Sequence, residues 1–190
     1  MGKCKTRLAV KVGEQAALDI YKFLLSHTVS ITSQLDVDKW VFYSNEIWEE
    51  DIWANGTYQK KLQNGTDLGQ RMLNAFQEGF ESGYEKIVII GSDMYDLSQA
   101  DLESAFSQLD QHDYAVGPAE DGGYYLLGMR ALNKKLFQDK QWGTETVLED
   151  TLAHLEQEKV GLLPVKNDVD HYEDIKDIKA FQPFLKHMKE

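Results

Sequence analysis

The segment KIVIIGSDMYDLS, residues 86–98, decides the fold class of this chain. Four branched apolar residues, Ile87 to Ile90, run without alternation into Gly-Ser-Asp, which is typical of a strand covered on both faces. In open α/β sheets, ligands bind beyond the carboxyl ends of the strands, so Asp93 is predicted to project into such a crevice. A carboxylate there needs a cation, and hard oxygen ligands favour Mg²⁺ or Mn²⁺. The alternative, that Asp93 caps a turn or the next helix, has about equal weight on this pattern alone.

The rest of the chain alternates predicted strands with predicted helices. Ser98 is expected to cap one helix, with Asp101 in the place of the capping-box Glu. The alternation predicts one α/β domain over residues 1–190 with a mostly parallel sheet. Periodicity and turn residues place strands at 39–44, 58–62, 86–90, 114–117, 124–129 and 160–164, and helices at 14–31, 67–80, 100–109, 144–158 and 173–188.

Composition excludes several classes of protein. The chain has 190 residues, 42% of them hydrophobic, and a formal net charge of -12, so nucleic acid and anionic membranes are poor partners. No apolar run approaches the ~20 residues that cross a bilayer, so we expect no membrane insertion. Cys4 is the single cysteine, which rules out an intrachain disulfide and a cysteine-based zinc site. We therefore expect a cytoplasmic protein.

A second acidic element lies near the carboxyl terminus, in KNDVDHYEDI at residues 166–175. Asp168 and Asp170 stand two residues apart just after a predicted strand. In an extended segment such residues point to the same side, where two carboxylates can share a cation. The alternative, capping of the next helix, is somewhat favoured on this evidence alone.

Three further motifs suit ligands but have simpler interpretations. EDGGYYLLG at residues 120–128 allows close backbone approach to a ligand, although a hairpin turn is favoured by roughly two to one. NGTDLGQRM at residues 64–72 opens a helix, whose amino-terminal amides can hold an anion. GKCKTRL at residues 2–8 suits a diphosphate or triphosphate, the alternative being a solvated basic tail.

Taken in order, six motifs resemble a bacterial glycosyltransferase subfamily, DUF2064-type, of the nucleotide-diphospho-sugar transferase superfamily. The resemblance extends over nearly the whole chain, and the chain is similar, more distantly, to guanylyltransferases acting on 2-phospho-lactate and on the molybdenum cofactor. It implies a Rossmann-like, three-layer α/β/α fold of the GT-A type. The motifs are GKCKTRL, GTDLGQRM, IIGSDMYDL, GPAEDGGYYLLG, WGTETVLEDTL and DVDHYEDI.

The resemblance also implies roles for matching residues on the nucleotide side. Asp93 would bind the Mg²⁺ or Mn²⁺ ion, and Asp170 would complete that metal site. The nucleotide-binding residues would be Lys5 and Arg7, at the phosphates, and Asp67, Leu68 and Gly69, along the nucleotide.

On the acceptor side, the resemblance implies binding by Gly122, Gly123, Trp142 and Thr144, although a core role for Trp142 is at least as consistent with its sequence context. Asp121 beside these glycines is the candidate general base, so that Asp93 and Asp121 are the implied catalytic acids.

The implied function is a metal-dependent transferase with a nucleotide-activated donor, in the first place a glycosyltransferase. Its partners would be a nucleotide sugar, or a nucleoside triphosphate, and a small-molecule acceptor. Nucleotidyl transfer to a phosphorylated small molecule is the second hypothesis, which pyrophosphate release would distinguish. A non-catalytic nucleotide-binding protein is the third.

One departure from the resemblance concerns the first strand of the fold. In relatives, GKCKTRL follows a buried strand that is central in the sheet, whereas Met1 immediately precedes that motif here. An absent central strand leaves backbone groups and apolar faces without partners. We therefore expect reduced stability, aggregation or a compensating contact in a homodimer.

Overall fold

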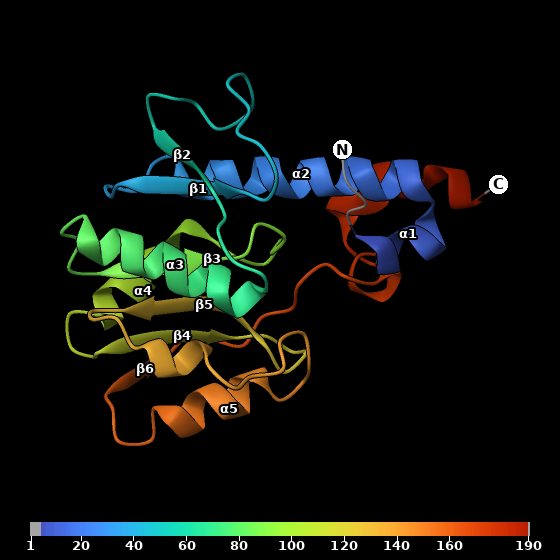
Figure 1. The fold of residues 1–190 in the computed structure, drawn as a ribbon. Helices are drawn as coiled ribbons and strands as arrows, with labels where there is room; N and C mark the ends of the chain where they lie inside the picture. The colour runs from blue at the N-terminus through green and yellow to red at the C-terminus, as the bar shows by residue number, and fades with distance from the viewer. Residues whose placement is uncertain (1–4, 190) are drawn as a thin grey trace.

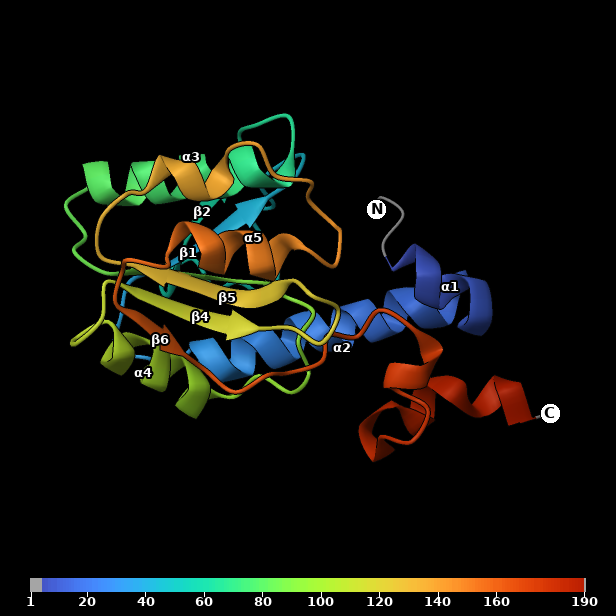
Figure 2. The same cartoon turned by 90° about the horizontal axis from the view of Figure 1, so that it is seen from below.

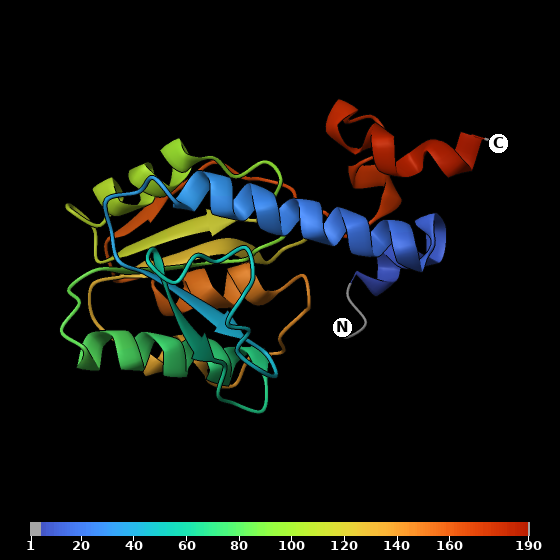
Figure 3. The ribbon, with the colours of Figure 1, turned by 90° about the horizontal axis from the view of Figure 1, so that it is seen from above.

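The computed structural model describes residues 5–189; Met1 to Cys4 and Glu190 lie outside the described part, as does the start of the basic GKCKTRL motif. Helices α2 (Glu14–Thr32) and α4 (Gln99–Gln108) cover one face of the strands, and α3 (Leu68–Glu81) and α5 (Val147–His154) cover the other, which makes the three layers expected from the resemblance (Figures 1, 2 and 3). The first half of the chain contains α1 (Thr6–Val12), α2 (Glu14–Thr32), β1 (Lys39–Tyr43), β2 (Tyr58–Leu62), α3 (Leu68–Glu81) and β3 (Ile87–Ile90).

The second half contributes more strands and several short helical segments. They are α4 (Gln99–Gln108), β4 (Tyr114–Pro118), β5 (Tyr124–Met129), η1 (Lys134–Phe137), α5 (Val147–His154), β6 (Val160–Leu162), η2 (Tyr172–Asp174) and η3 (Lys179–Lys189).

The strands form two separate sheets. β1 and β2 pair in parallel, and the other sheet has the order β3-β5-β4-β6. Within it β4 and β6 are parallel, but β5 is antiparallel to both β3 and β4. The larger sheet is therefore mixed rather than mostly parallel. The reason is the short connection of residues 119–123, since a parallel neighbour would need a crossover of about a dozen residues or more.

That connection is the hairpin turn favoured from the sequence. The amide of Ala119 donates to the carbonyl of Gly123 at 3.0 Å, and the amide of Gly122 donates back to Ala119 at 3.2 Å. Gly122 has a φ of 85°, and an added Cβ would lie 2.1 Å from the carbonyl oxygen of Glu145. Only glycine fits this position, because any side chain would meet both backbone strain and a clash.

The predicted helix starts of the central region are confirmed. Asp67 caps α3 by accepting a bond from the amide of Gln70. Ser98 and Asp101 form the predicted capping box at α4, with the amide of Ser98 donating to Asp101 Oδ2 at 2.9 Å. Each such cap satisfies amides that a helix start leaves without partners.

The terminal segments differ from the sequence prediction. Residues 6–12, expected only as a basic segment, form helix α1, whose Leu8 and Val12 are buried against α2. The predicted closing helix is replaced by 3₁₀ segments, with Pro183 inside η3. Proline lacks the amide that an α-helix requires. Helix α1 and segment η3 both lie at the same end of α2, beyond the sheets (Figure 1).

Candidate active site

A cavity of about 1830 Å³ passes between β1 and β3 and opens beyond the carboxyl end of β3. At this open end, three carboxylates from separate loops line the cavity: Asp93 after β3, Asp121 in the hairpin turn, and Asp168 after β6. Convergence of loops at the carboxyl edge is the usual place for a ligand in this class of fold. We take this end of the cavity as the candidate active site.

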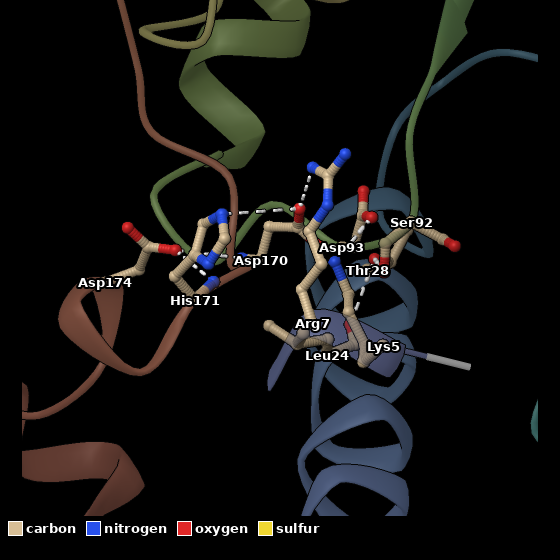
Figure 4. A network of polar contacts seen from close by, with 9 residues as sticks. All are labelled: Lys5, Arg7, Leu24, Thr28, Ser92, Asp93, Asp170, His171 and Asp174. Carbon is tan, nitrogen blue, oxygen red and sulfur yellow. Dashed lines mark hydrogen bonds and ion pairs between the residues drawn. The ribbon is translucent and has the colours of Figure 1, made fainter. Parts of the chain in front are cut away.

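Asp93 is paired with a lysine from the amino-terminal segment. The Nζ of Lys5 lies 2.8 Å from Oδ2 of Asp93, and the Lys5 side chain is only 7% exposed, against 38% for Asp93 (Figure 4). Lys5 precedes α1 in a left-handed conformation with φ 49°. The structure thus brings together the predicted phosphate-binding lysine and the predicted metal-binding acid.

The loop that carries Asp93 is held by α2 and by the segment after β6. The hydroxyl of Thr28 donates to the carbonyl of Ser92 at 3.2 Å, and the amide of Val169 donates to the carbonyl of Asp93 at 3.3 Å. These two bonds place Asp93 next to the segment that contains Asp168.

The predicted pair of Asp168 and Asp170 is divided between two environments. Asp170 does not line the cavity; its Oδ2 lies 2.6 Å from Nη1 of Arg7, which is 66% exposed (Figure 4). Asp174 holds this segment by accepting bonds from the amides of Asp170 and His171. Asp168, rather than Asp170, shares the cavity with Asp93.

Asp168 is the electrostatically perturbed acid of the site. Burial raises the pKa of its carboxyl, and the charges of Asp121 and Asp93 raise it further, partly offset by Lys5. Several carboxylates close together in a half-buried place repel one another, so a cation or a proton is favoured there. The sequence pattern had placed Asp168 and Asp170 together as possible cation ligands, but the resemblance assigned the metal-binding role to Asp170 alone.

The residues predicted along the nucleotide have different surroundings. Leu68 is 52% exposed and lines the cavity, whereas Asp67 is occupied in capping α3. Gly69 is buried beneath Trp142, where an added Cβ would lie 2.2 Å from the indole Nε1. Arg71, from the same motif, also lines the cavity and was missed as a candidate.

The predicted acceptor-side residues surround the same opening. Gly123, Trp142 and Thr144 line the cavity, and Gly122 supports the turn from outside it. The ring of Trp142 packs against Tyr124 with centroids 6.5 Å apart, so this side chain is part of the packed wall and reaches the cavity as well. The Asp121 Oδ1 atom accepts a bond from the amide of Gly123 at 2.9 Å, which fixes its carboxylate at the turn.

Sequence reasoning also missed a polar cluster under the loop of residues 44–57. Lys60 lies 2.9 Å from Asp51, and the two side chains are 7% and 13% exposed. Burial alone would raise the pKa of Asp51, but hydrogen bonds from Lys60 and Tyr43 lower it. These contacts hold the loop beside β1, where Trp48 and Ile52 line the rim of the cavity.

The acids supply the donor type that Mg²⁺ and Mn²⁺ take, but no complete metal cage is formed. Within residues 5–189, no group of three or more histidine, cysteine, aspartate or glutamate side chains could hold an ion. Magnesium commonly uses one or two carboxylates and completes its shell with waters and substrate phosphates. Asp93 and Asp168 fit such a partial site.

Comparisons with known proteins agree with this architecture. A crystal structure of a "putative nucleotide-diphospho-sugar transferase" from Desulfovibrio desulfuricans G20 is 29% identical, matches 99% of this chain and 90% of that one, and has a TM-score of 0.86. A Mycobacterium tuberculosis rv0371c homolog from mycobacterium sp. strain JC1 is 14% identical over 86% of this chain and 84% of that one, with a TM-score of 0.51, and supports the fold alone.

Other comparisons concern curated proteins, membrane helices and families. No curated protein is significantly similar to the chain. Among the described residues, no helix has the length and apolar character needed to span a bilayer. The family described as "Uncharacterized protein conserved in bacteria (DUF2064)" matches residues 28–144, more than half of the chain, so this protein is a member of the DUF2064 family.

Proposed function

We propose that the protein is a metal-dependent transferase that uses a nucleotide-activated donor, with a nucleotide sugar as the preferred donor class. The observation that carries the proposal is the convergence of Asp93, Asp121 and Asp168 with Lys5 at the carboxyl end of β3. The likeness to the Desulfovibrio desulfuricans structure supports the choice of reaction class.

The donor diphosphate is assigned to the cationic side of this site. Asp93 and Asp168 would hold Mg²⁺ or Mn²⁺, which supplies charge neutralisation for the diphosphate leaving group. Lys5 adds a positive charge close to Asp93, so it would stabilise the same developing charge. Arg71 lines the cavity nearby and could bind the nucleotide part of the donor.

The acceptor is assigned to the part of the cavity wall formed by Gly123, Trp142 and Thr144. In glycosyl transfer, an acceptor oxygen forms the bond to the anomeric carbon while the bond from that carbon to the diphosphate breaks. The acceptor hydroxyl proton would pass to the carboxylate of Asp121, and the nucleoside diphosphate would leave with the broken bond's electrons. The half-buried Trp142 ring lines this part of the cavity, where an aromatic surface would suit a sugar.

The test is turnover of a panel of nucleotide sugars with Mn²⁺, followed by analysis of the nucleotide product. Release of a nucleoside diphosphate supports glycosyl transfer, whereas release of pyrophosphate from a nucleoside triphosphate would establish nucleotidyl transfer instead. Asp93→Asn should lower turnover by roughly 100-fold or more, because several kcal/mol of charge stabilisation are lost.

A matched variant controls for the loss of any surface carboxylate. Asp177 is exposed and does not line the cavity, so Asp177→Asn should leave turnover unchanged. Full activity of Asp93→Asn, or nucleotide binding without turnover of any donor or triphosphate, would refute the proposal.

A further inference from the structure

The loop of residues 91–97, which carries Asp93, joins two hydrophobic clusters. The first, which we call the sheet cluster, contains buried side chains of α4, β4 and β5, such as Leu102 and Leu126. The second, the terminal cluster, contains buried side chains of α1, α2 and η3, such as Leu8 and Phe181. Helix α1 and the carboxyl-terminal segment lie beyond the sheets at one end of α2, so the two clusters belong to different parts of the molecule (Figures 2 and 3).

The side chains of this loop are divided between the two clusters. Met94 and Leu97 are buried in the sheet cluster, whereas Tyr95, between them, packs against the terminal cluster. The ring centroid of Tyr95 lies 4.9 Å from that of Phe181, edge to face, and 5.8 Å from that of Phe23. Aromatic pairs at these separations have preferred geometries, so they fix the direction of a side chain as well as burying it.

Helix α2 supports the same loop from behind. The imidazole centroid of His27 lies 5.3 Å from the ring centroid of Tyr95, and its Nε2 lies 2.9 Å from the carbonyl oxygen of Leu97. Thr28, the next residue of α2, donates to the carbonyl of Ser92 at 3.2 Å. The backbone of the loop is therefore held by α2 near both of its ends, and the ring of Tyr95 is held in its middle.

The Asp93 carboxylate makes contacts in two directions. Its Oδ2 lies 2.8 Å from the Nζ of Lys5, and its Oδ1 lies close to Gly91, whose added Cβ would be 2.9 Å from that oxygen. Lys5 immediately precedes α1, which belongs to the terminal cluster through Leu8. Asp93 thus extends from a loop that begins at the sheet and meets a cation from the terminal part of the molecule. A shift of either part against the other would separate the two charges.

We propose that Tyr95 is a positioning residue for Asp93. By packing between α2 and η3, its ring ties the loop to the part of the molecule that supplies Lys5, and so sets the place of the Asp93 carboxylate. The Tyr95 side chain does not line the cavity, so it acts through Asp93 rather than on a ligand. The contact with Lys5 is a property of the chain itself, and only the consequence for a metal ion rests on the proposed function.

The test measures the coupling between Lys5 and Asp93 in the wild-type chain and in two Tyr95 variants. Urea unfolding of Lys5→Met, Asp93→Asn and the double variant gives this coupling as the part of the double change that the single changes do not add up to. In the wild-type chain it should be roughly fivefold in the unfolding equilibrium constant. Tyr95→Leu keeps an apolar side chain but removes the ring, and should reduce the coupling to about twofold or less, whereas Tyr95→Phe should preserve it.

A matched variant controls for the loss of aromatic packing in the terminal cluster. Phe184→Leu removes a ring that packs on Phe23 with centroids 5.5 Å apart, but it leaves the rings around Tyr95 in place. It should lower the free energy of unfolding and leave the coupling between Lys5 and Asp93 unchanged. Full coupling in Tyr95→Leu, an equal loss in Tyr95→Phe or Phe184→Leu, or no coupling in the wild-type chain would overturn the proposal.

Mn²⁺ binding distinguishes this proposal from the proposed function. In the Lys5→Met background no ammonium competes for Asp93, and Tyr95→Leu should weaken Mn²⁺ binding by roughly tenfold, as when a residue that orients a metal ligand is lost. Electron paramagnetic resonance of free Mn²⁺ measures the affinity. Equal affinities with and without Tyr95→Leu would overturn the proposal, because Asp93 would keep its place without the ring. If Lys5→Met binds no Mn²⁺ while Tyr95→Leu abolishes the coupling, the metal assignment fails and the positioning role of Tyr95 stands.

Discussion

The ammonium of Lys5 lies 2.8 Å from Oδ2 of Asp93, so the acid assigned to the metal already has a cation beside it. The two residues are 88 positions apart in the chain and meet because Lys5, which precedes α1, reaches the loop that follows β3. If the proposed function holds, a metal ion and Lys5 would compete for this carboxylate until a bound diphosphate interacts with both cations.

This competition predicts opposite effects of Lys5→Met on binding and on turnover. Without nucleotide, the variant should bind Mn²⁺ roughly fivefold more tightly, because a partly buried ion pair worth ~1 kcal/mol no longer has to be broken. With a donor, turnover should fall, because the diphosphate loses a cation. Free Mn²⁺ measured by electron paramagnetic resonance, beside steady-state turnover, checks both effects. Weaker Mn²⁺ binding in the variant would contradict the competition.

The contact of Gly69 with Trp142 predicts a steric coupling between α3 and the acceptor-side loop. Gly69→Ala should destabilise the protein by roughly 1–3 kcal/mol, because its Cβ would lie 2.2 Å from the indole nitrogen. Gly56→Ala is the matched control, since no atom lies within 4 Å of its added Cβ. Denaturant unfolding measures the free energy of unfolding of both variants. In a Trp142→Ala background the cost of Gly69→Ala should nearly vanish, and a full cost there would exclude Trp142 as the cause.

The raised pKa of Asp168 predicts that this acid opposes folding at neutral pH in the absence of metal. Because its folded-state pKa lies above its unfolded value, the stability contributed by the protonated form is present below about pH 3.8 and is lost as pH rises through the folded pKa. Asp168→Asn should therefore raise Tm at pH 7, and the gain should shrink as pH falls toward about 4. Thermal unfolding in a chelator across this range checks the trend. A gain that is independent of pH would point to packing rather than charge.

The capping box of α4 predicts the opposite pH dependence at Asp101. Burial would raise its pKa, but hydrogen bonds from Ser98 and Lys166 lower it, so its contribution is present above about pH 3.8 and is lost as pH falls through the lowered folded pKa. Asp101→Asn should destabilise the protein at pH 7, and the loss of stability should be smaller at pH 3. Ser98→Ala, which removes the reciprocal cap, should cost about 1 kcal/mol at either pH. Urea unfolding at pH 7 and pH 3 separates the two variants.

The local elements of the fold followed from neighbouring residues. The apolar run of Ile87 to Ile90, the cap at Ser98 and the turn at Gly122 each depend on interactions within a few positions, so their sequence patterns were sufficient. Helix α1 was missed because it is short, and its two buried residues, Leu8 and Val12, join a cluster with α2 and with distant residues of the carboxyl-terminal segment such as Phe181.

What the sequence by itself determined is that strands and helices alternate and that acids follow the strands at Asp93 and Asp168, because strand periodicity, caps and turns are short-range properties. Tertiary structure alone decided that β3 pairs with the outer edge of the β4–β5 hairpin, that Lys5 pairs with Asp93, and that Asp170 pairs with Arg7 outside the cavity. Tertiary structure alone also placed β1 and β3 in different sheets. Each of these depends on which distant surfaces bury one another, and the free energy of that burial belongs to pairs of elements rather than to any one segment.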